Sequence, residues 1–456
     1  MNRHPFLRYV TWMALLLAGL LAPSTPALAA EGTPTVAPVL TDGDGNTIQV
    51  ALQVKEISNL GAFDLDLDAA GSILRIQSGS LGSSFLDSSG RQVHALGPEV
   101  KFNGVTLAVG AYTTGDQPGA SGTGVLATAE MVVQAEGIGY LTPSRVVLGA
   151  PDATSIPVER QVAGIQVQEV AQGWNLMGVC PELGDQPLES ALQTIQGRYN
   201  AVWDADNRPV DALQGGTGAW LRLTAGAPVR LVTLGPARRP TSPMALGPGW
   251  NLVSYCGKGA VDLVAALASI QGKYDRVIGL RGAYDVQLGA SYQTLTTLYP
   301  GEAVLIHMTG SATLTFPEVG SRERPRQRPR AGCPAVAPTP TMTLLYGDVR
   351  QNGVPAPAGT LVEALDSSGQ VVGCVAVDQD GRFGLMAVYG RDGEAGIPGY
   401  QAGEILRLRV GACVQEAGFA WQNDRTPHRV DVALNGQGCQ VEGEGYRLFL
   451  PLTTKQ

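Results

Sequence analysis

An internal duplication constrains the fold of this chain more than any other feature of its sequence. The segment Gly173–Cys180 (GWNLMGVC) recurs 76 positions later as Gly249–Cys256 (GWNLVSYC), and Ala191–Tyr199 recurs 75 positions later as Ala266–Tyr274. Repetition at a nearly fixed spacing indicates a duplicated structural unit. Each copy is predicted to run strand, short helix, strand, strand. The helices are expected at Pro187–Ile195 and Val261–Ile270, and the closing strands at Ala219–Thr224 and Ala303–Thr309.

Two such copies are expected to pack together, because a unit of this size cannot bury its apolar face alone. A pseudo-twofold arrangement would place Trp174 and Trp250 at matching positions in a shared core. Stacking of these rings on a carbohydrate is the alternative interpretation, although rings inside an apolar strand are more often buried. Cys180 and Cys256 end the matching strands, and we predict a disulfide between them.

The composition predicts short strands joined by many turns. Charged residues make up 16% of the 456 residues, while glycine occurs 59 times and proline 30 times. Apolar residues at helical spacing are nearly absent outside the two short helices, so the predicted fold class is mainly β and multidomain. The predicted parts are a signal peptide (1–30), a β-sandwich (31–168), an α+β repeat domain (169–316, copies 173–234 and 249–316), a linker (317–341), a second β-sandwich (342–440) and an apolar tail (441–456).

Residues 1–30 have the three parts of a secretory signal peptide. Arg3 and Arg8 precede the apolar run Trp12–Ala22, which leads to the small residues around Leu28. That run is shorter than the ~20 residues needed to span a bilayer, so we expect no membrane span after signal removal. The net charge of −8 becomes −10 without the two arginines. An acidic, secreted or cell-surface protein without affinity for nucleic acid is predicted.

All six cysteines follow the predicted signal peptide, and an exported protein meets an oxidising environment. They are Cys180, Cys256, Cys333, Cys374, Cys413 and Cys439. Their even number permits three disulfides, but the count does not determine the pairing. Besides Cys180–Cys256, the expected pairs are Cys374–Cys413, clipping the second sandwich, and Cys333–Cys439.

Apolar and acidic residues alternate between Ala62 and Leu67, which predicts a strand with one buried and one wet face. Phe63, Leu65 and Leu67 are expected in the core, and Asp64 and Asp66 outside it. After a turn at 68–71, a second alternating run follows at 73–78. About nine strand-like runs between residues 33 and 167 predict a β-sandwich.

Four segments of this region carry a family resemblance. They are Asn59–Leu67 (NLGAFDLDL), Leu86–Arg91 (LDSSGR), Gly119–Val133 (GASGTGVLATAEMVV) and Gly164–Val167 (GIQV). Their order resembles the cohesin family and its relatives among secreted carbohydrate-binding modules, over roughly 135 residues. The resemblance implies a nine-stranded jelly-roll sandwich whose exposed sheet binds another module, the dockerin of a secreted enzyme in the best-known members. The family's Tyr-Asp-Pro turn is replaced here by residues 68–70, so no contact residue is carried over.

The C-terminal third begins with a linker that contains five arginines among residues 322–330. Prolines keep such a segment extended, and a grip on an acidic glycan is the alternative role for its arginines. The strands that follow resemble small transthyretin-like or carboxypeptidase-regulatory modules, with hairpin turns expected at 366–369 and 378–381. The tail contains LPxT at 450–453 without the glycine of a sortase signal, so sortase anchoring is not expected. The apolar end is expected to dock as a final strand, with recognition by a secretion system as the alternative.

Catalytic motifs are not recognisable in the sequence. Residues 119–123 lack the last glycine of a nucleophile elbow. Residues 122–127 spell a dinucleotide-like GxGxxA, but a strand rather than a helix is predicted to follow. Asp64 and Asp66 share one face as a glycosidase pair could, yet carboxylates alternating along a strand usually face solvent.

Metal-binding motifs are not recognisable in the sequence either. Asp42, Asp44 and Asn46 have the spacing of a calcium loop but lack its distal glutamate, so a plain turn is expected. There is no CxxC pair, and the histidines that follow the signal peptide, His94, His307 and His428, are too far apart in sequence to suggest a zinc site.

The sequence therefore predicts a non-catalytic secreted or cell-surface binding protein without a cofactor. Its partner would be a polysaccharide or a dockerin-bearing secreted protein, in polysaccharide catabolism or attachment. The alternatives are a secreted hydrolase with an unrecognised site, perhaps in the repeat domain, and a structural envelope protein. A cleft in the repeat domain would favour the first alternative, and self-assembly the second.

Overall fold

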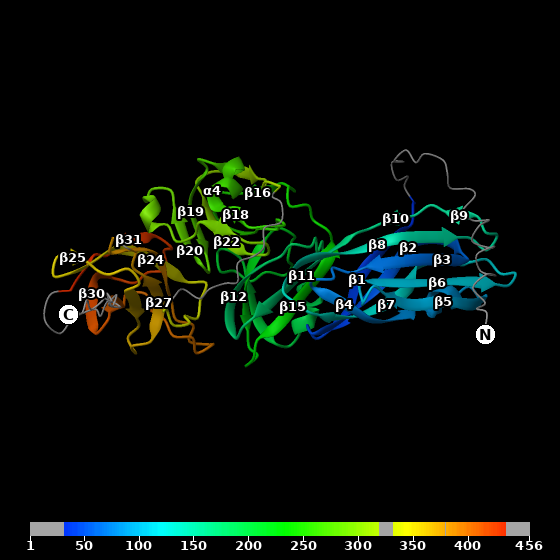
Figure 1. Cartoon of the computed structure of the whole chain (residues 1–456), viewed down its shortest axis with the longest axis horizontal. Coiled ribbons are helices and arrows are strands. Elements are labelled where there is room, and N and C mark those ends of the chain that lie inside the picture. Colours follow the sequence, from blue (N-terminus) through cyan, green and yellow to red (C-terminus); the bar gives the residue numbers. More distant parts are fainter. Residues whose placement is uncertain (1–31, 319–331, 379, 435–456) are drawn as a thin grey trace, which may run out of the picture.

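The computed structural model describes residues 32–318, 332–378 and 380–434. The predicted signal peptide, half of the predicted linker, Cys439 and the tail lie outside these residues. The fold is mainly β, as predicted. It is elongated, with an N-terminal sandwich at one end, the C-terminal strands at the other and the duplicated units between them (Figure 1). Within the described residues, no helix has the length and apolarity needed to cross a membrane.

The N-terminal part is a sandwich of two sheets. One has the strand order β10-β1-β2-β7-β4, and the other β15-β11-β8-β3-β6-β5 with β9 paired to β8. The strands are β1 (Thr35–Gly43), β2 (Thr47–Leu60), β3 (Ala62–Asp68), β4 (Leu74–Leu81), β5 (Gln92–Lys101), β6 (Thr106–Thr114), β7 (Ala120–Val133), β8 (Gly137–Gly149), β9 (Ser155–Ile156), β10 (Glu159–Arg160) and β11 (Ala163–Val170). Eleven strands are observed where about nine were predicted, and two of them, β9 and β10, have only two residues each.

The alternating segment behaves as predicted. Phe63, Leu65 and Leu67 of β3 are buried in the sandwich core, while Asp64 and Asp66 point outward and are half-buried. β3 and β4 lie in opposite sheets, so the turn between them carries the chain across the sandwich. The apolar faces of both strands therefore meet in the same core.

The first repeat is joined to this sandwich by a shared sheet. Its strand β15 (Val229–Pro236) pairs antiparallel with β11 from Ala163↔Pro236 to Val170↔Val229. Val232 and Leu234 of β15 belong to the sandwich core. The two parts thus form one continuous sheet rather than separate domains in loose contact.

Each repeat contains the predicted strand, short helix, strand and strand in that order, and both have further elements that were not predicted. The first consists of β12 (Gly173–Gly178), α3 (Leu188–Ala191), η2 (Gln193–Ile195), β13 (Tyr199–Trp203), β14 (Gly218–Leu223) and β15. The second consists of β16 (Met244–Leu246), β17 (Gly249–Ser254), β18 (Val261–Asp262), α4 (Leu263–Ala266), η3 (Ala268–Ile270), β19 (Tyr274–Gly279), β20 (Gly282–Asp285), η4 (Ala290–Tyr292), β21 (Thr297–Leu298), β22 (Ala303–Met308) and β23 (Ala312–Leu314). In each, the GWNL strand pairs with the closing strand, as β12-β14-β13 and β17-β22-β19-β20.

The GWN motif occurs in both repeats for a local structural reason. Gly173 and Gly249 have φ of 89° and 88°, a left-handed conformation that glycine adopts without a steric penalty. The Asn175 amide donates to the carbonyls of Ala171 (2.8 Å) and Gly173 (3.0 Å). Asn251 makes the same two bonds one repeat later. Glycine permits the turn into the strand, and asparagine closes it.

The repeats share a core, and the C-terminal sandwich completes it. Trp174, at 3% exposure, and the partly buried Trp250 pack into one cluster with residues of the C-terminal strands such as Leu344 and Leu385. Their positions match, as predicted. The prediction of a core made by the repeats alone was incomplete, because a third element covers it.

The C-terminal part is a second sandwich. One sheet has the order β25-β24-β28, with β31 and β32 also paired to β24, and the other has the order β27-β26-β29-β30. The strands are β24 (Met342–Gln351), β25 (Val354–Pro355), β26 (Leu361–Leu365), β27 (Val371–Ala376), β28 (Arg382–Tyr389), β29 (Ile405–Val410), β30 (Cys413–Ala420), β31 (Pro427–Arg429) and β32 (Val432–Leu434). The turn at 366–369 is a hairpin, whereas the turn at 378–381 connects strands of different sheets and the hairpin prediction there was wrong.

The disulfides agree with the predictions only in part. Cys180 and Cys256 are joined, with Cα atoms 5.5 Å apart. Cys374 is joined to Cys333 rather than to Cys413, so the expected pairs Cys374–Cys413 and Cys333–Cys439 were wrong. Residues 332–341 lie against the C-terminal sandwich, where the hydroxyl of the buried Thr339 donates to the Gly390 carbonyl (2.9 Å). The predicted linker therefore ends in a docked segment, and docking brings Cys333 to β27.

Candidate binding surface of the N-terminal sandwich

The two outer faces of the sandwich differ in chemistry. The outer face of β2 and β7 presents polar side chains such as Gln49, Thr128 and Glu130. The outer face of β8-β3-β6-β5 instead exposes Leu96 (47%), Tyr112 (42%) and Val147 (37%). Large apolar side chains left in water on one side of a complete sandwich mark that side as a candidate interaction surface.

The pairing register places these residues in adjoining rows. One row crosses the sheet as Leu96, Gly110, Asp64 and Val147, and the next as His94, Tyr112, Ala62 and Gly149. A third contains Ala108, Asp66 and Arg145. We call the group Asp64, Asp66, His94, Leu96, Tyr112 and Val147 the β3 face. Its larger side chains flank a floor of alanine and glycine, so the centre of the sheet stays accessible.

An aromatic pair fixes one edge of the β3 face. The rings of His94 and Tyr112 stack with centroids 4.8 Å apart and an interplanar angle of 19°. The Nε2 atom of His94 lies 3.0 Å from the Thr114 hydroxyl. These contacts hold the His94 and Tyr112 rings against each other.

The centre of the β3 face is acidic. Asp64 forms an ion pair with Arg145. Burial raises the pKa of the Asp64 carboxyl and the neighbouring Asp66 adds to the rise, while Arg145 opposes it. Within the described part of the chain, the Asp66 carboxylate has no ion-pair or hydrogen-bond partner. Asp66 is therefore available to a partner that carries donors or positive charge.

The β5–β6 hairpin adds an exposed tip beside this face. Phe102 is 76% exposed and has φ of 52°, which is unusual for a bulky residue. The turn is closed by the Gly104 amide, which donates to the Lys101 carbonyl (3.1 Å). An aromatic ring held in water by a left-handed backbone is available for contact.

Sequence reasoning found the acidic residues of the β3 face and missed its apolar ones. β5 contains Pro98, which is tolerated because β5 is the edge strand. Leu96 was not singled out from the sequence, and His94 was considered only as a metal ligand. The outward period-2 positions of β6, Tyr112 and Thr114, were the available signal.

The other sequence candidates do not assemble into sites. Asp44 accepts bonds from the Asn46 and Thr47 amides (2.8 and 2.9 Å), which lower the pKa of its carboxyl and close an ordinary turn. Among the described residues, no three His, Cys, Asp or Glu side chains are grouped to hold a metal ion. Residues 122–127 lie in β7, so the GxGxxA segment belongs to a strand, as predicted.

The tryptophans of the repeats are covered rather than displayed. Trp174 packs against Trp203, with ring centroids 4.4 Å apart and an interplanar angle of 45°, and donates from Nε1 to Asp392 (2.7 Å). Trp250 lies under the buried Arg425, whose guanidinium carbon is 5.3 Å from the ring centroid. Neither ring is available as a carbohydrate platform.

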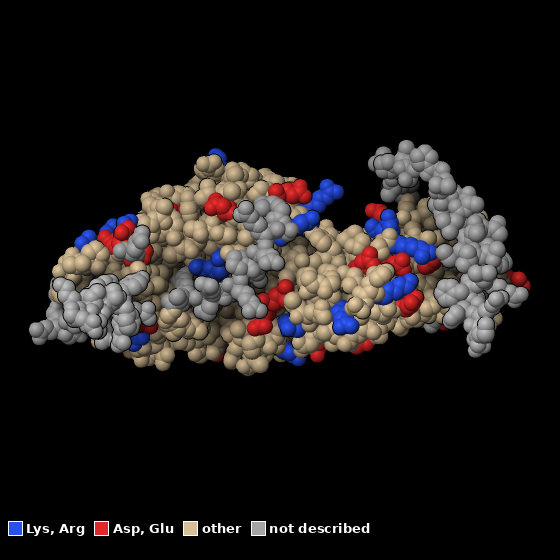
Figure 2. All heavy atoms as spheres, viewed as in Figure 1, with Lys and Arg blue, Asp and Glu red and all other residues tan. Residues whose placement is uncertain are grey.

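Charged side chains are interspersed on the side of the molecule shown in Figure 2. Acidic and basic groups alternate there over the N-terminal sandwich, with wide uncharged areas between them. Recognition on the scale of a few side chains, such as the β3 face, suits such a surface better than long-range attraction by a single sign of charge.

When the chain was compared with known proteins, only solved structures showed a similarity to it. No protein-family model matches the chain, and no curated protein matches it. One similar solved structure is a non-cellulosomal cohesin from the archaeon Archaeoglobus fulgidus, at 20% identity over 28% of this chain and 87% of that chain (TM-score 0.23). A type I cohesin–dockerin complex from Clostridium thermocellum has 12% identity over 30% and 95% (TM-score 0.24). A type II cohesin from the cellulosome of Acetivibrio cellulolyticus has 13% over 28% and 93% (TM-score 0.24).

Proposed function

We propose that the protein is a non-catalytic, exported binding protein whose N-terminal sandwich holds a protein partner on the β3 face. The observation that carries the proposal is the joint exposure of Leu96, Tyr112 and Val147 around an acidic centre, on a sandwich whose core is already complete. Tyrosine and apolar side chains grouped with a few charges are typical of the centre of protein interfaces.

The partner that we propose is a dockerin-type module of a secreted protein. The support is the order of the four cohesin-like segments in the sequence, one of which, Asn59–Leu67, includes residues 62–67 of β3. Asp66 without a partner and the half-buried Asp64 favour an incoming surface with hydroxyl or basic groups. Display of such modules would serve extracellular polysaccharide use or attachment.

Export is part of the same proposal. The segment 1–30 has the pattern of a signal peptide, and the disulfides Cys180–Cys256 and Cys333–Cys374 suit an oxidising compartment. We propose that the mature protein is extracellular or held at the cell surface.

The test is binding of the exported chain, from residue 31 onward, to dockerin modules from secreted proteins of the same cell. Biolayer interferometry should give saturable binding. Tyr112→Ala and Leu96→Ala should each weaken it by about 10-fold or more, as loss of an aromatic or apolar anchor of an interface does. The matched controls Gln49→Ala and Thr128→Ala, on the outer face of the other sheet, should leave it unchanged. Equal effects of both pairs, or no binding to any dockerin module, would contradict the proposal.

A further inference from the structure

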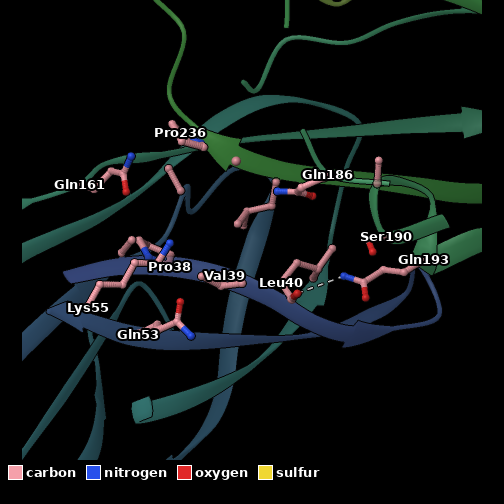
Figure 3. Close-up of a pocket in the computed structure, with 15 residues that line it drawn as sticks. Pro38, Val39, Leu40, Gln53, Lys55, Gln161, Gln186, Ser190, Gln193 and Pro236 are labelled. Atoms are coloured by element: carbon pink, nitrogen blue, oxygen red, sulfur yellow. Dashed lines mark hydrogen bonds between the residues drawn. The ribbon is translucent and has the colours of Figure 1, made fainter. Parts of the chain in front are cut away.

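A pocket of about 400 Å³ lies where the N-terminal sandwich meets the first repeat. It opens between the outer face of β1 and β2, the α3–η2 segment and the end of β15 (Figure 3). Its size falls within the range of roughly 300–1,000 Å³ that small-molecule sites occupy. Its lining comes from β1 and β2 of one sheet and, in the other sheet, from Ala163 of β11 and the end of β15.

The lining combines an apolar floor with amide walls. Its polar side chains are Gln53, Lys55, Gln161, Gln186, Ser190 and Gln193. Ala37, Val39, Leu40 and Leu234 supply apolar surface. No acidic and no aromatic side chain is among the lining residues, so Lys55 carries the only formal charge there.

The pocket is built from elements that are fixed to one another. The Gln193 amide donates to the Leu40 carbonyl (3.1 Å), which ties η2 to β1. The Val232 amide donates to the Thr194 hydroxyl (3.0 Å), which ties β15 to η2. The backbone N–H of Gln161 donates to the Val36 carbonyl (2.9 Å). A ligand would therefore meet a preformed site and lose little affinity to ordering it.

Three amide side chains at this site have unused hydrogen-bonding capacity. Gln53, Gln161 and Gln186 are half-buried, and within the described residues none of their side-chain amides has a partner. Each primary amide offers two donors and a carbonyl acceptor. Figure 3 shows these side chains distributed around one common space. Partly buried polar groups without protein partners favour a ligand that supplies both donors and acceptors.

Hydroxyl groups satisfy this requirement, because each one both donates and accepts. The C–H faces of a sugar ring suit the apolar floor. Lys55 at the edge, with no carboxylate beside it in the lining, favours a ligand that carries negative charge. From this chemistry we propose that the pocket binds an acidic saccharide, a uronate-bearing one in particular. The site is independent of the β3 face and of the dockerin proposal.

The experiment uses the exported chain from residue 31 and two matched probes, digalacturonate and its neutral counterpart galactobiose. Isothermal titration should show binding of digalacturonate, with a dissociation constant below about 1 mM. Galactobiose should bind about 10-fold more weakly, and higher salt should weaken only digalacturonate. Lys55→Gln should remove the preference, while Gln53→Ala and Gln161→Ala should weaken both probes by about 5-fold or more.

Controls come from the same strand and the same residue types. Gln49→Ala, also outward on β2, and Lys101→Gln, on the β5–β6 hairpin, should leave both affinities unchanged. The thermal midpoint of each variant is measured beside that of the parent, so that a folding defect is recognised. If Gln53→Ala does not fold, Gln53→Glu takes its place. The proposal is overturned if digalacturonate does not bind, if Lys55→Gln leaves the preference intact, or if the controls weaken binding as much as the pocket variants. Dockerin binding is measured on the same samples and does not affect this outcome.

Discussion

Cys180 and Cys256 form a disulfide that joins the ends of the two GWNL strands, with Cα atoms 5.5 Å apart and 76 positions between them in sequence. The Ser254 hydroxyl lies 3.5 Å from the Cys180 sulfur, and the Cys180 amide donates to the buried side chain of Gln166 on β11 (2.8 Å). The bond therefore links the repeats to each other at the place where they meet the N-terminal sandwich.

Removal of this disulfide should destabilise the protein substantially. A closed loop of this length restricts the unfolded chain by about 4 kcal/mol in the chain-entropy model, and measured losses are typically about 2–4 kcal/mol. The double variant Cys180→Ala, Cys256→Ala should lose that amount in urea unfolding without reductant. Adding reductant should lower the stability of the parent further than that of the variant. Two freely alkylated thiols at these positions in the exported protein would contradict the structure.

Substitution of Gly249 tests whether the GWN motif depends on the left-handed backbone conformation of its glycine. A Cβ built on it meets nothing within 4 Å, so Gly249→Ala should cost only the left-handed conformation, about 1–2 kcal/mol. Gly247, two residues earlier, has equally open surroundings but no left-handed φ, and Gly247→Ala should be close to neutral. Thermal unfolding of the two variants measures the difference. Equal losses would show that the motif does not depend on the conformation of Gly249.

The parts of the fold that local pattern determines were predicted well. Alternation identified the buried and outward residues of β3, because side chains in a strand point to opposite sides in turn. The duplication predicted matching elements and matching tryptophans, because two similar sequences fold into similar units. Both inferences use neighbours in sequence or an explicit repeat.

Long-range pairing was not accessible in this way. Nothing in the local pattern of β15 shows that it pairs with β11 instead of with its own repeat. The Cys333–Cys374 pair depends on residues 332–341 docking on the C-terminal sandwich, which a Pro- and Arg-rich composition does not suggest. The amide-lined pocket combines Gln53 with Gln186, and only the shared sheet brings them together.

Asp392 should make the protein sensitive to acid. It accepts bonds from the Arg222 guanidinium (2.9 Å) and the Trp174 indole (2.7 Å), which join the first repeat to the C-terminal sandwich. Burial alone would raise the pKa of Asp392, but bonds from Arg222, the Ala395 amide and Trp174 outweigh it and lower that pKa. The carboxylate therefore adds stability above its unfolded pKa of 3.8, and this stability is lost as the pH falls through the lower folded value.

Comparison with Asp392→Asn isolates that contribution. The advantage of the parent in free energy of unfolding should be full at pH 6 and should shrink below about pH 4. Tryptophan fluorescence follows the change, because Trp174 loses its bond to the carboxylate. A parent advantage that stays constant from pH 6 to pH 3 would refute the assignment.

Tyr400 should make the folded protein lose stability at alkaline pH. Its hydroxyl is buried, donates to the Leu365 carbonyl and accepts from the Arg407 amide (2.9 Å). Burial raises the pKa of this phenol, although the bond from Arg407 opposes the rise. The unfolded chain releases the proton near pH 10 while the folded protein retains it, so stability is lost as the pH rises above about 10.

Tyr400→Phe should cost about 1–3 kcal/mol at pH 8, where it leaves the Leu365 carbonyl and Arg407 amide unpaired. That difference should narrow above pH 10 in urea unfolding, whereas Tyr112→Phe, on the exposed β3 face, should follow the parent throughout. A gap between parent and Tyr400→Phe that does not narrow would show that the phenol does not govern alkaline unfolding.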